Sequence, residues 1–120
     1  MTEIILYIED NDDMGTLLVR RLRRMDKLVM VAESGKEGIE MAVHHMPALI
    51  FMDYNMPEMN GVEVTRRLKA FPATQTIPIV MLTADNSVET RAAALAAGCD
   101  AFLTKPVKRE ELEGILNQLL

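Results

Sequence analysis

Five short apolar runs divide the chain, and each is followed by a segment whose apolar residues recur at helical spacing. The runs cover residues 3–8, 28–32, 48–53, 77–83 and 101–103. Strands that alternate with helices pair in parallel, because a parallel pair needs a long crossover between its strands. The alternation therefore predicts an α/β fold, a doubly wound five-stranded parallel sheet with helices on both faces. We expect one domain over residues 1–120.

Helix starts and stops are marked in the segments between these runs. Ser34, Asn60 and Ser87 precede three helical segments as capping residues, and Asp12 or Asp13 can cap the first, over residues 14–25. Pro47, Pro72 and Gly98 mark the ends of three helices, and the last helix is expected over residues 108–119. Helical spacing predicts that the residues facing the core include Leu17, Leu18, Leu22, Ile39, Ala42, Val43, Met46, Val64, Leu68, Phe71, Leu112 and Leu116.

Composition excludes several classes of protein. The single cysteine, Cys99, cannot form a disulfide within the chain, which favours a reducing cytoplasmic location. No apolar run approaches the roughly 20 residues of a membrane span, and the start of the chain has no signal-peptide pattern. The net charge of −5 argues against direct nucleic-acid binding. The arginines within residues 20–24 are expected to form the solvated face of the first helix.

Chemically capable side chains stand where four of the five expected strands end. Glu9 and Asp10 follow the first strand, Asp53 ends the third, Thr83 ends the fourth and Lys105 follows the fifth. Open parallel sheets bind ligands beyond the carboxyl ends of their strands. In the flavodoxin-like strand order 2-1-3-4-5, the four strands that end in these side chains are neighbours. We therefore expect three carboxylates, a hydroxyl and an ammonium to share one crevice.

This set of groups suits phosphoryl transfer to a carboxylate. Several carboxylates in one pocket repel one another unless a cation lies among them. Oxygen ligands without histidine or cysteine favour a hard ion, Mg²⁺ first. A carboxylate can also act as the nucleophile that forms an aspartyl phosphate. The hydroxyl of Thr83 and the ammonium of Lys105 are suitable donors to phosphoryl oxygens.

Four motifs resemble the receiver domain of two-component response regulators, particularly the small regulators of chemotaxis. They are ILYIEDN near the start, D-x-x-M-P-x-M-x-G from Asp53 to Gly61, LTA at 82–84 and LTKP at 103–106. The resemblance covers essentially the whole chain, with the motifs in the expected order. It implies that Asp53 is the phosphoacceptor and receives its phosphoryl group from a sensor histidine kinase or a histidine phosphotransfer protein. It also implies a cis bond between Lys105 and Pro106.

The resemblance further implies how the remaining groups divide their work. Asp10, Asp53 and the main-chain carbonyl of Asn55 would ligate Mg²⁺, with Glu9 reaching the ion through water. Thr83 and Lys105 would bind the phosphoryl oxygens. Phe102 would be the switch residue whose rotamer follows Thr83. Receivers often have aspartate in place of Glu9 and tyrosine in place of Phe102. Because Phe102 has no hydroxyl, a switch in this chain would work by packing alone.

The function expected from this resemblance is signalling: phosphorylation switches the conformation and so controls an output protein or a fused output domain. The chain would not be an enzyme in the usual sense, since it would catalyse only its own phosphorylation and slow autodephosphorylation.

An aspartyl-nucleophile phosphatase is disfavoured, because haloacid-dehalogenase-like enzymes need a second aspartate at the position of Asn55. A docking module that has lost phosphorylation is disfavoured, because Asp10, Asp53 and Lys105 are all present. A stand-alone regulator, a hybrid-kinase receiver and an excised N-terminal domain remain open, as do a monomer and a phosphorylation-dependent homodimer.

Overall fold

The structure, a computed structural model, describes residues 3–10 and 12–120, and for residues 12–16 the description covers the backbone alone. Its five strands are β1 (Ile4–Ile8), β2 (Leu28–Ala32), β3 (Leu49–Asp53), β4 (Ile79–Thr83) and β5 (Ala101–Thr104). All pair in parallel, in the order β2-β1-β3-β4-β5. The predicted fold class and strand order are therefore confirmed.

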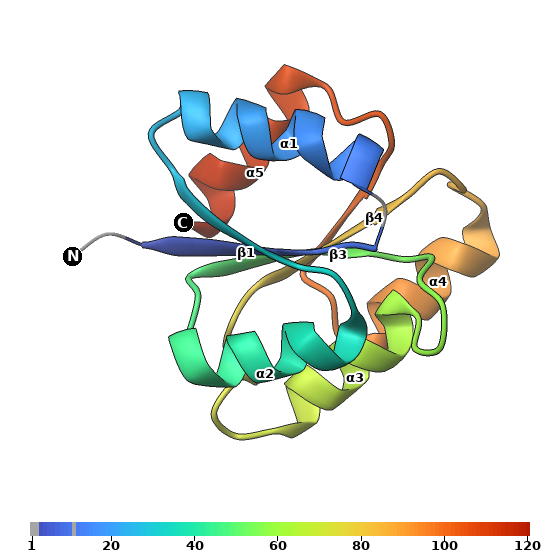
Figure 1. Ribbon diagram of the computed structural model, residues 1–120. Helices are drawn as coiled ribbons and strands as arrows, with labels where there is room; N and C mark the ends of the chain where they lie inside the picture. The colour runs from blue at the N-terminus through green and yellow to red at the C-terminus, as the bar shows by residue number, and fades with distance from the viewer. Residues whose placement is uncertain (1–2, 11) are drawn as a thin grey trace.

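Five helices cover the two faces of this sheet. They are α1 (Asp12–Arg24), α2 (Gly35–His45), α3 (Gly61–Ala70), α4 (Val88–Ala97) and α5 (Arg109–Leu119). Figure 1 shows α1 and α5 on one face and α2, α3 and α4 on the other. Within the described part of the chain, no helix has the length and apolar character needed to cross a membrane.

Two separate cores lie on the two faces of the sheet, because successive side chains of a strand point to opposite sides. From β1, Ile5 and Tyr7 pack on the α1/α5 side, whereas Leu6 and Ile8 pack on the side of α2, α3 and α4. Every residue of β3 is buried. Burial of a large apolar side chain stabilises a fold by about 1.5–3 kcal/mol, so β3 is held firmly from both sides.

Local capping signals explain the helix boundaries. The side chains of Ser34, Asn60 and Ser87 accept hydrogen bonds from backbone N–H groups in the first turns of α2, α3 and α4, at 3.1, 3.0 and 3.2 Å. Gly98 ends α4 in a left-handed conformation, with φ of 107°, and the bond from Lys105 to Pro106 is cis, as predicted. Asp12 and Asp13, the expected caps of the first helix, lie within α1, which begins two residues earlier than expected; their side chains are outside the description.

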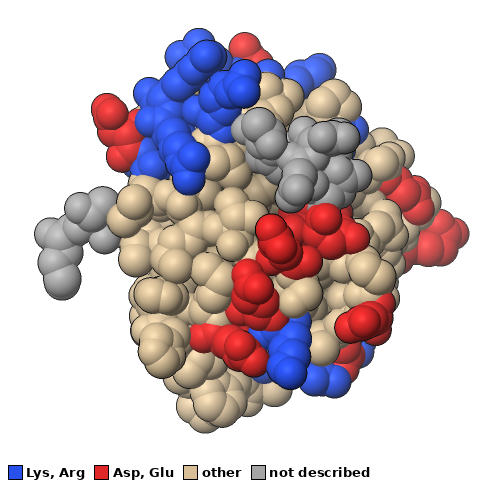
Figure 2. Space-filling model, viewed as in Figure 1, with Lys and Arg blue, Asp and Glu red and all other residues tan. Residues whose placement is uncertain are grey.

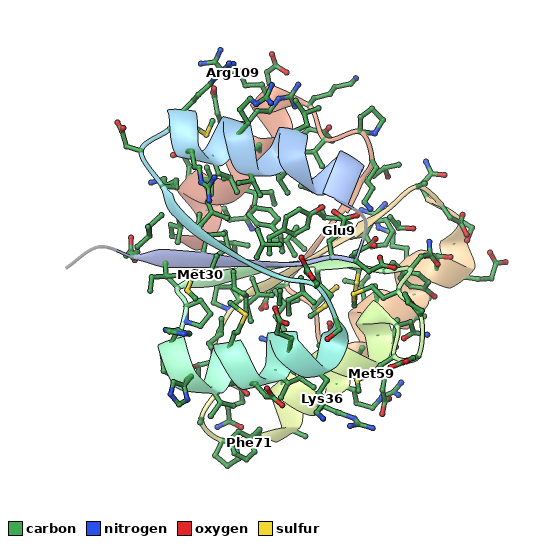
Figure 3. All side chains as sticks on the ribbon, in the orientation of Figure 1. Glu9, Met30, Lys36, Met59, Phe71 and Arg109 are labelled. Carbon is green, nitrogen blue, oxygen red and sulfur yellow. The ribbon has the colours of Figure 1, made fainter. Side chains whose placement is uncertain are left out.

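Four residues predicted to face the core are instead exposed, by 39–51%. Phe71 lies beyond the end of α3 in extended backbone, so the helical spacing no longer applies to it; Figure 3 shows its ring directed away from the sheet. Met46 follows α2 in a left-handed conformation, which likewise takes it off the stripe. Leu17 and Val43 lie within helices, at the margins of their apolar stripes.

Candidate functional site

The site lies at the edge of the sheet where the carboxyl ends of the parallel strands meet. Glu9 follows β1 directly, Asp53 is the last residue of β3, and Thr83 is the last residue of β4. Figure 3 shows Glu9 at this end of β1. The register pairs Ile8 with Met52, so Glu9 and Asp53 occupy equivalent positions on neighbouring strands. Their side chains therefore point to the same face of the sheet.

Lys105 lies between the two carboxylates. Its Nζ donates hydrogen bonds to Oδ1 of Asp53 at 2.9 Å and to Oε1 of Glu9 at 3.1 Å. The three side chains are 12%, 5% and 2% exposed for Lys105, Asp53 and Glu9 respectively. Two buried anions and one cation therefore share a pocket that water barely enters. Such a group is stable only while every charge keeps its partners.

The pKa values of Glu9 and Lys105 are both raised, but for different reasons. Burial raises the pKa of Glu9 above its usual value, and the hydrogen bond from Tyr7 and the charge and hydrogen bond of Lys105 only partly offset that rise. For Lys105, burial acts to lower the pKa, but the hydrogen bond and charge of Asp53, followed by those of Glu9, outweigh it. The pKa of Lys105 is thus raised, and the side chain is a permanent cation at neutral pH.

Thr83 ends β4 with its side chain fully buried. Its Oγ1 accepts a hydrogen bond from the backbone N–H of Asp85 at 3.0 Å. Asp85 in turn accepts hydrogen bonds from the hydroxyl of Thr90 and the backbone N–H of Ser87, at 2.8 and 2.9 Å. Thr83 is therefore linked through Asp85 to the first turn of α4.

Phe102 is half-buried in β5, on the side of α2, α3 and α4. The guanidinium carbon of Arg91, in α4, lies 5.4 Å from the centroid of its ring, within the range of a cation–π contact. The Arg91 guanidinium therefore adds a charged contact to the apolar packing of the Phe102 ring.

Asp10 and Asn55 are both exposed. Asp10 follows Glu9, and Asn55 lies in the loop between β3 and α3. Gly61 closes that loop, with its N–H donating to the carbonyl of Tyr54 at 2.9 Å. Among residues 3–10 and 17–120, no three histidine, cysteine, aspartate or glutamate side chains come together as a set of metal ligands.

One residue of the site was missed by the sequence reasoning. Tyr7 lies two positions before Glu9 in β1, and its hydroxyl donates a hydrogen bond to Oε2 of Glu9. A polar hydroxyl inside an otherwise apolar strand, two residues before a carboxylate, was the available signal, because such residues share one face.

Charges are distributed unevenly over the surface. Figure 2 shows basic side chains gathered over α1, and the last turn of that helix contains Arg21, Arg23 and Arg24. Arg23 and Arg24 are exposed as expected, whereas Arg21 is half-buried and donates a hydrogen bond to the carbonyl of Val107. This contact ties α1 to the segment that follows Lys105.

The sequence of the chain is similar to those of known response regulators. Residues 5–117 match the family model of the response regulator receiver domain. The response regulator Rre1 of Synechocystis sp. is 37% identical over 95 residues, which cover 79% of this chain and 41% of that protein. The chain spans about half the length of several other regulators, among them PrrA of Mycobacterium tuberculosis.

Solved structures share the fold over almost the whole chain. The chemotaxis protein CheY4 of Vibrio cholerae has a TM-score of 0.92 at 27% identity, with 100% of each chain covered. The receiver domain of the sensor histidine kinase PA1611 of Pseudomonas aeruginosa has a TM-score of 0.91 at 31% identity, covering 99% of this chain and 98% of that one. A magnesium ion is coordinated in the active site cleft of the PA1611 structure.

Proposed function

Because the chain belongs to the response regulator receiver domain family, we propose that residues 1–120 act as a receiver domain that accepts a phosphoryl group on Asp53. The donor is a sensor histidine kinase or a histidine phosphotransfer protein. The observation that carries this proposal is the position of Lys105, whose Nζ lies 2.9 Å from Asp53 in a buried pocket shared with Glu9. A fixed cation beside a carboxylate nucleophile suits the charge that an incoming phosphoryl group brings.

The chemistry assigned to Asp53 is nucleophilic attack. One carboxylate oxygen forms a bond to phosphorus while the bond between phosphorus and the donor's imidazole nitrogen breaks, which leaves an aspartyl phosphate. Lys105 then moves part of its hydrogen bonding from Asp53 to a phosphoryl oxygen, and the hydroxyl of Thr83 donates to another. Asp53 fits this role because it ends a strand that is buried along its whole length.

The donor atoms at the site suit a magnesium ion. The carboxylates of Glu9 and Asp53 already converge on one cation, Lys105, and every available ligand is oxygen. Mg²⁺ commonly uses only one or two carboxylates, together with waters and substrate phosphate, so three clustered acidic side chains are not needed. We propose that Asp10, Asp53 and the carbonyl of Asn55 hold the ion and that Glu9 reaches it through water. When bound, Mg²⁺ neutralises charge on the transferring phosphoryl group.

The carboxylates at this edge of the sheet predict that Asp10→Asn stabilises the metal-free protein. Asp10 follows Glu9 and adds a negative charge at the edge where, among the described side chains, Lys105 is the cation paired with Glu9 and Asp53. Without metal, the variant should be more stable than the wild type by about 0.5–1 kcal/mol, a typical gain when a functional site is relaxed. Excess Mg²⁺ should reverse the order, because the variant loses a ligand to an ion that binds only the native state.

Urea unfolding of both proteins, in EDTA and in excess Mg²⁺, measures this effect. Glu40→Gln, which neutralises an exposed carboxylate in α2, is the control and should change stability by no more than about 0.5 kcal/mol. A less stable Asp10→Asn protein in EDTA would show that Asp10 is mainly structural.

The response to phosphorylation is proposed to pass from Thr83 to Phe102. If Thr83 Oγ1 turns to a phosphoryl oxygen, its hydrogen bond from the N–H of Asp85 is lost, and the segment leading to α4 is released. Phe102 then repacks, together with Arg91 on its ring. Such a change shifts a two-state domain toward the conformation that binds an output protein or output domain.

Other aspects of the proposal follow the family. The domain acts in the cytoplasm and binds neither nucleic acid nor membrane directly. It works as a monomer or as a phosphorylation-dependent homodimer. It is no general enzyme, since it promotes only its own phosphorylation and its slow autodephosphorylation.

The proposal is tested by phosphorylation with a small acyl phosphate. The wild type should gain one phosphate in the presence of Mg²⁺ and little in EDTA, as seen by intact-mass measurement. Asp53→Asn should gain none, because an amide is not nucleophilic. Asp26→Asn, which changes an exposed aspartate between α1 and β2, serves as the control and should still be phosphorylated. Equal modification of Asp53→Asn and the wild type would disprove the assignment.

A further inference from the structure

Tyr7 is a buried polar residue that the proposed chemistry leaves unexplained. Its side chain is 1% exposed and packs in the core between the sheet and the α1/α5 layer. Its hydroxyl donates to Oε2 of Glu9, while Lys105 donates to the other oxygen, Oε1. Among the described residues, the two oxygens of Glu9 are thus held by two different donors, one in β1 and one directly after β5.

This arrangement fixes the direction of the Glu9 carboxylate. The terminal torsion of a glutamate side chain is broad and roughly two-fold, so a single donor leaves the carboxylate free to swing. A second donor at Oε2 holds that oxygen toward the α1/α5 core. Oε1 is then directed at the pocket of Asp53 and Lys105. Tyr7 and Lys105 also line the same pocket, of about 110 Å³.

The hydrogen bond from Tyr7 becomes more important once Lys105 is drawn away. Lys105 is shared with Asp53, and in the proposed function it turns to a phosphoryl oxygen. Glu9 then keeps Tyr7 as its donor on the core side. A buried carboxylate that lost both donors would leave its position, because an unpaired buried charge is strongly unfavourable.

We propose that Tyr7 is a positioning residue for the magnesium site, which it serves by holding Glu9 in the orientation that faces Asp53. This inference rests on the proposed function, because it assigns Glu9 to the hydration shell of the ion. Residues that orient metal ligands typically change metal affinity by about 10–100-fold when they are replaced. Glu9 contacts the ion through water, so an effect at the low end of that range is expected.

The test compares two tyrosine-to-phenylalanine variants. Tyr7→Phe removes only the hydroxyl and should raise the dissociation constant for Mg²⁺ about tenfold, measured by isothermal titration calorimetry. Tyr54→Phe is the matched control, because Tyr54 follows Asp53 directly but packs on the opposite face of the sheet. It should leave the Mg²⁺ affinity unchanged. Unchanged or tighter Mg²⁺ binding by Tyr7→Phe would overturn the inference.

A double-mutant cycle separates positioning from general packing. If Tyr7 acts through Glu9, the tenfold effect of Tyr7→Phe should disappear in a Glu9→Gln background, because the neutral amide no longer offers the carboxylate being positioned. A merely structural role would give the same loss of affinity in both backgrounds, and that outcome would also overturn the inference. Circular dichroism of all four proteins checks that each is folded.

A second readout remains available if Tyr7→Phe fails to fold. The chain has two tyrosines and no tryptophan, so in Tyr54→Phe the only tyrosine is Tyr7. Its fluorescence should change saturably as Mg²⁺ is added, at the same concentrations as in calorimetry. Binding of Mg²⁺ without such a change would contradict a contact between Tyr7 and the ion's surroundings.

Failure of this inference can be told apart from failure of the proposed function. If Asp53 is phosphorylated and the wild type binds Mg²⁺ but Tyr7→Phe binds it equally well, only the role of Tyr7 is wrong. If the wild type binds no Mg²⁺, the proposed metal site and the role of Tyr7 are both wrong.

Discussion

Lys105→Ala should destabilise the metal-free protein by about 3 kcal/mol at neutral pH. Lys105 is the cation that contacts both Glu9 and Asp53, whose side chains are 2% and 5% exposed. Removing one partner of a buried ion pair typically costs about 3–5 kcal/mol, because it leaves an uncompensated charge in the interior. Lys105 is partly reached by solvent, which places the expected value at the low end.

Magnesium should restore much of this lost stability. Without the lysine, none of the described side chains places a cation between the two carboxylates, so Mg²⁺ should stabilise Lys105→Ala more than it stabilises the wild type. Urea unfolding in EDTA and in excess Mg²⁺ measures both effects. Lys36→Ala removes an exposed lysine from α2 and should change stability by no more than about 0.5 kcal/mol.

Acidification should narrow the gap between Lys105→Ala and the wild type. Burial already raises the pKa of Glu9 above its usual value, and Lys105 opposes that rise, so removal of Lys105 raises the pKa further. The folded variant then binds a proton more tightly than the unfolded chain does. Its stability is greatest below the unfolded pKa and falls as pH rises through the folded pKa. Equal stability of the two proteins in EDTA at neutral pH would show that Lys105 does not balance these carboxylates.

Gly61→Ala should destabilise the fold by about 3 kcal/mol and disturb the site as well. A Cβ at this position would lie 2.4 Å from the carbonyl oxygen of Asp53 and 3.0 Å from the Cα of Tyr54. Both are backbone atoms, so the loop after β3 must move to admit the methyl group. Overpacking of this kind costs about 1–3 kcal/mol, and the rigid backbone neighbours favour the upper value.

Gly114→Ala provides the matched control for that substitution. Gly114 lies within α5, and a Cβ there would have nothing within 4 Å. Alanine should therefore stabilise the protein by about 0.5–1 kcal/mol through its higher helix propensity. Thermal or urea unfolding of the two variants should shift in opposite directions. Destabilisation of equal size in both would mean that the close approach of Gly61 to Asp53 is not the cause.

Much of the fold could be predicted because its signals are local. The caps Ser34, Asn60 and Ser87 each accept a hydrogen bond from a residue three positions later, so their effect is contained in a few consecutive residues. The strand order could be predicted because four strands end in polar side chains, and the order 2-1-3-4-5 makes those four strands neighbours. Phe71 was placed wrongly because helical spacing says which face a residue occupies only while the helix continues, and α3 ends at Ala70.

The contacts within the site were harder to predict because they join distant parts of the chain. Sequence reasoning brought Glu9, Asp53 and Lys105 to one crevice, but it assigned Lys105 to phosphate and did not foresee that it bridges the two carboxylates. That bridge depends on the register of β1 and β3 and on the side-chain rotamers. The contact of Arg91 with Phe102 likewise depends on how α4 packs against β5.

The complete burial of β3 also limits how the sequence can diverge. Leu49 and Phe51 pack in one core, and Ile50 and Met52 pack in the other, so a change at any of them alters the packing that supports Asp53. The exposed residues of the helices, such as Arg23 and Arg24, carry no such restriction. Substitutions should therefore accumulate on the outer surfaces of the helices, and descendants of this chain can present new surfaces to other molecules while the residues around Asp53 stay where they are.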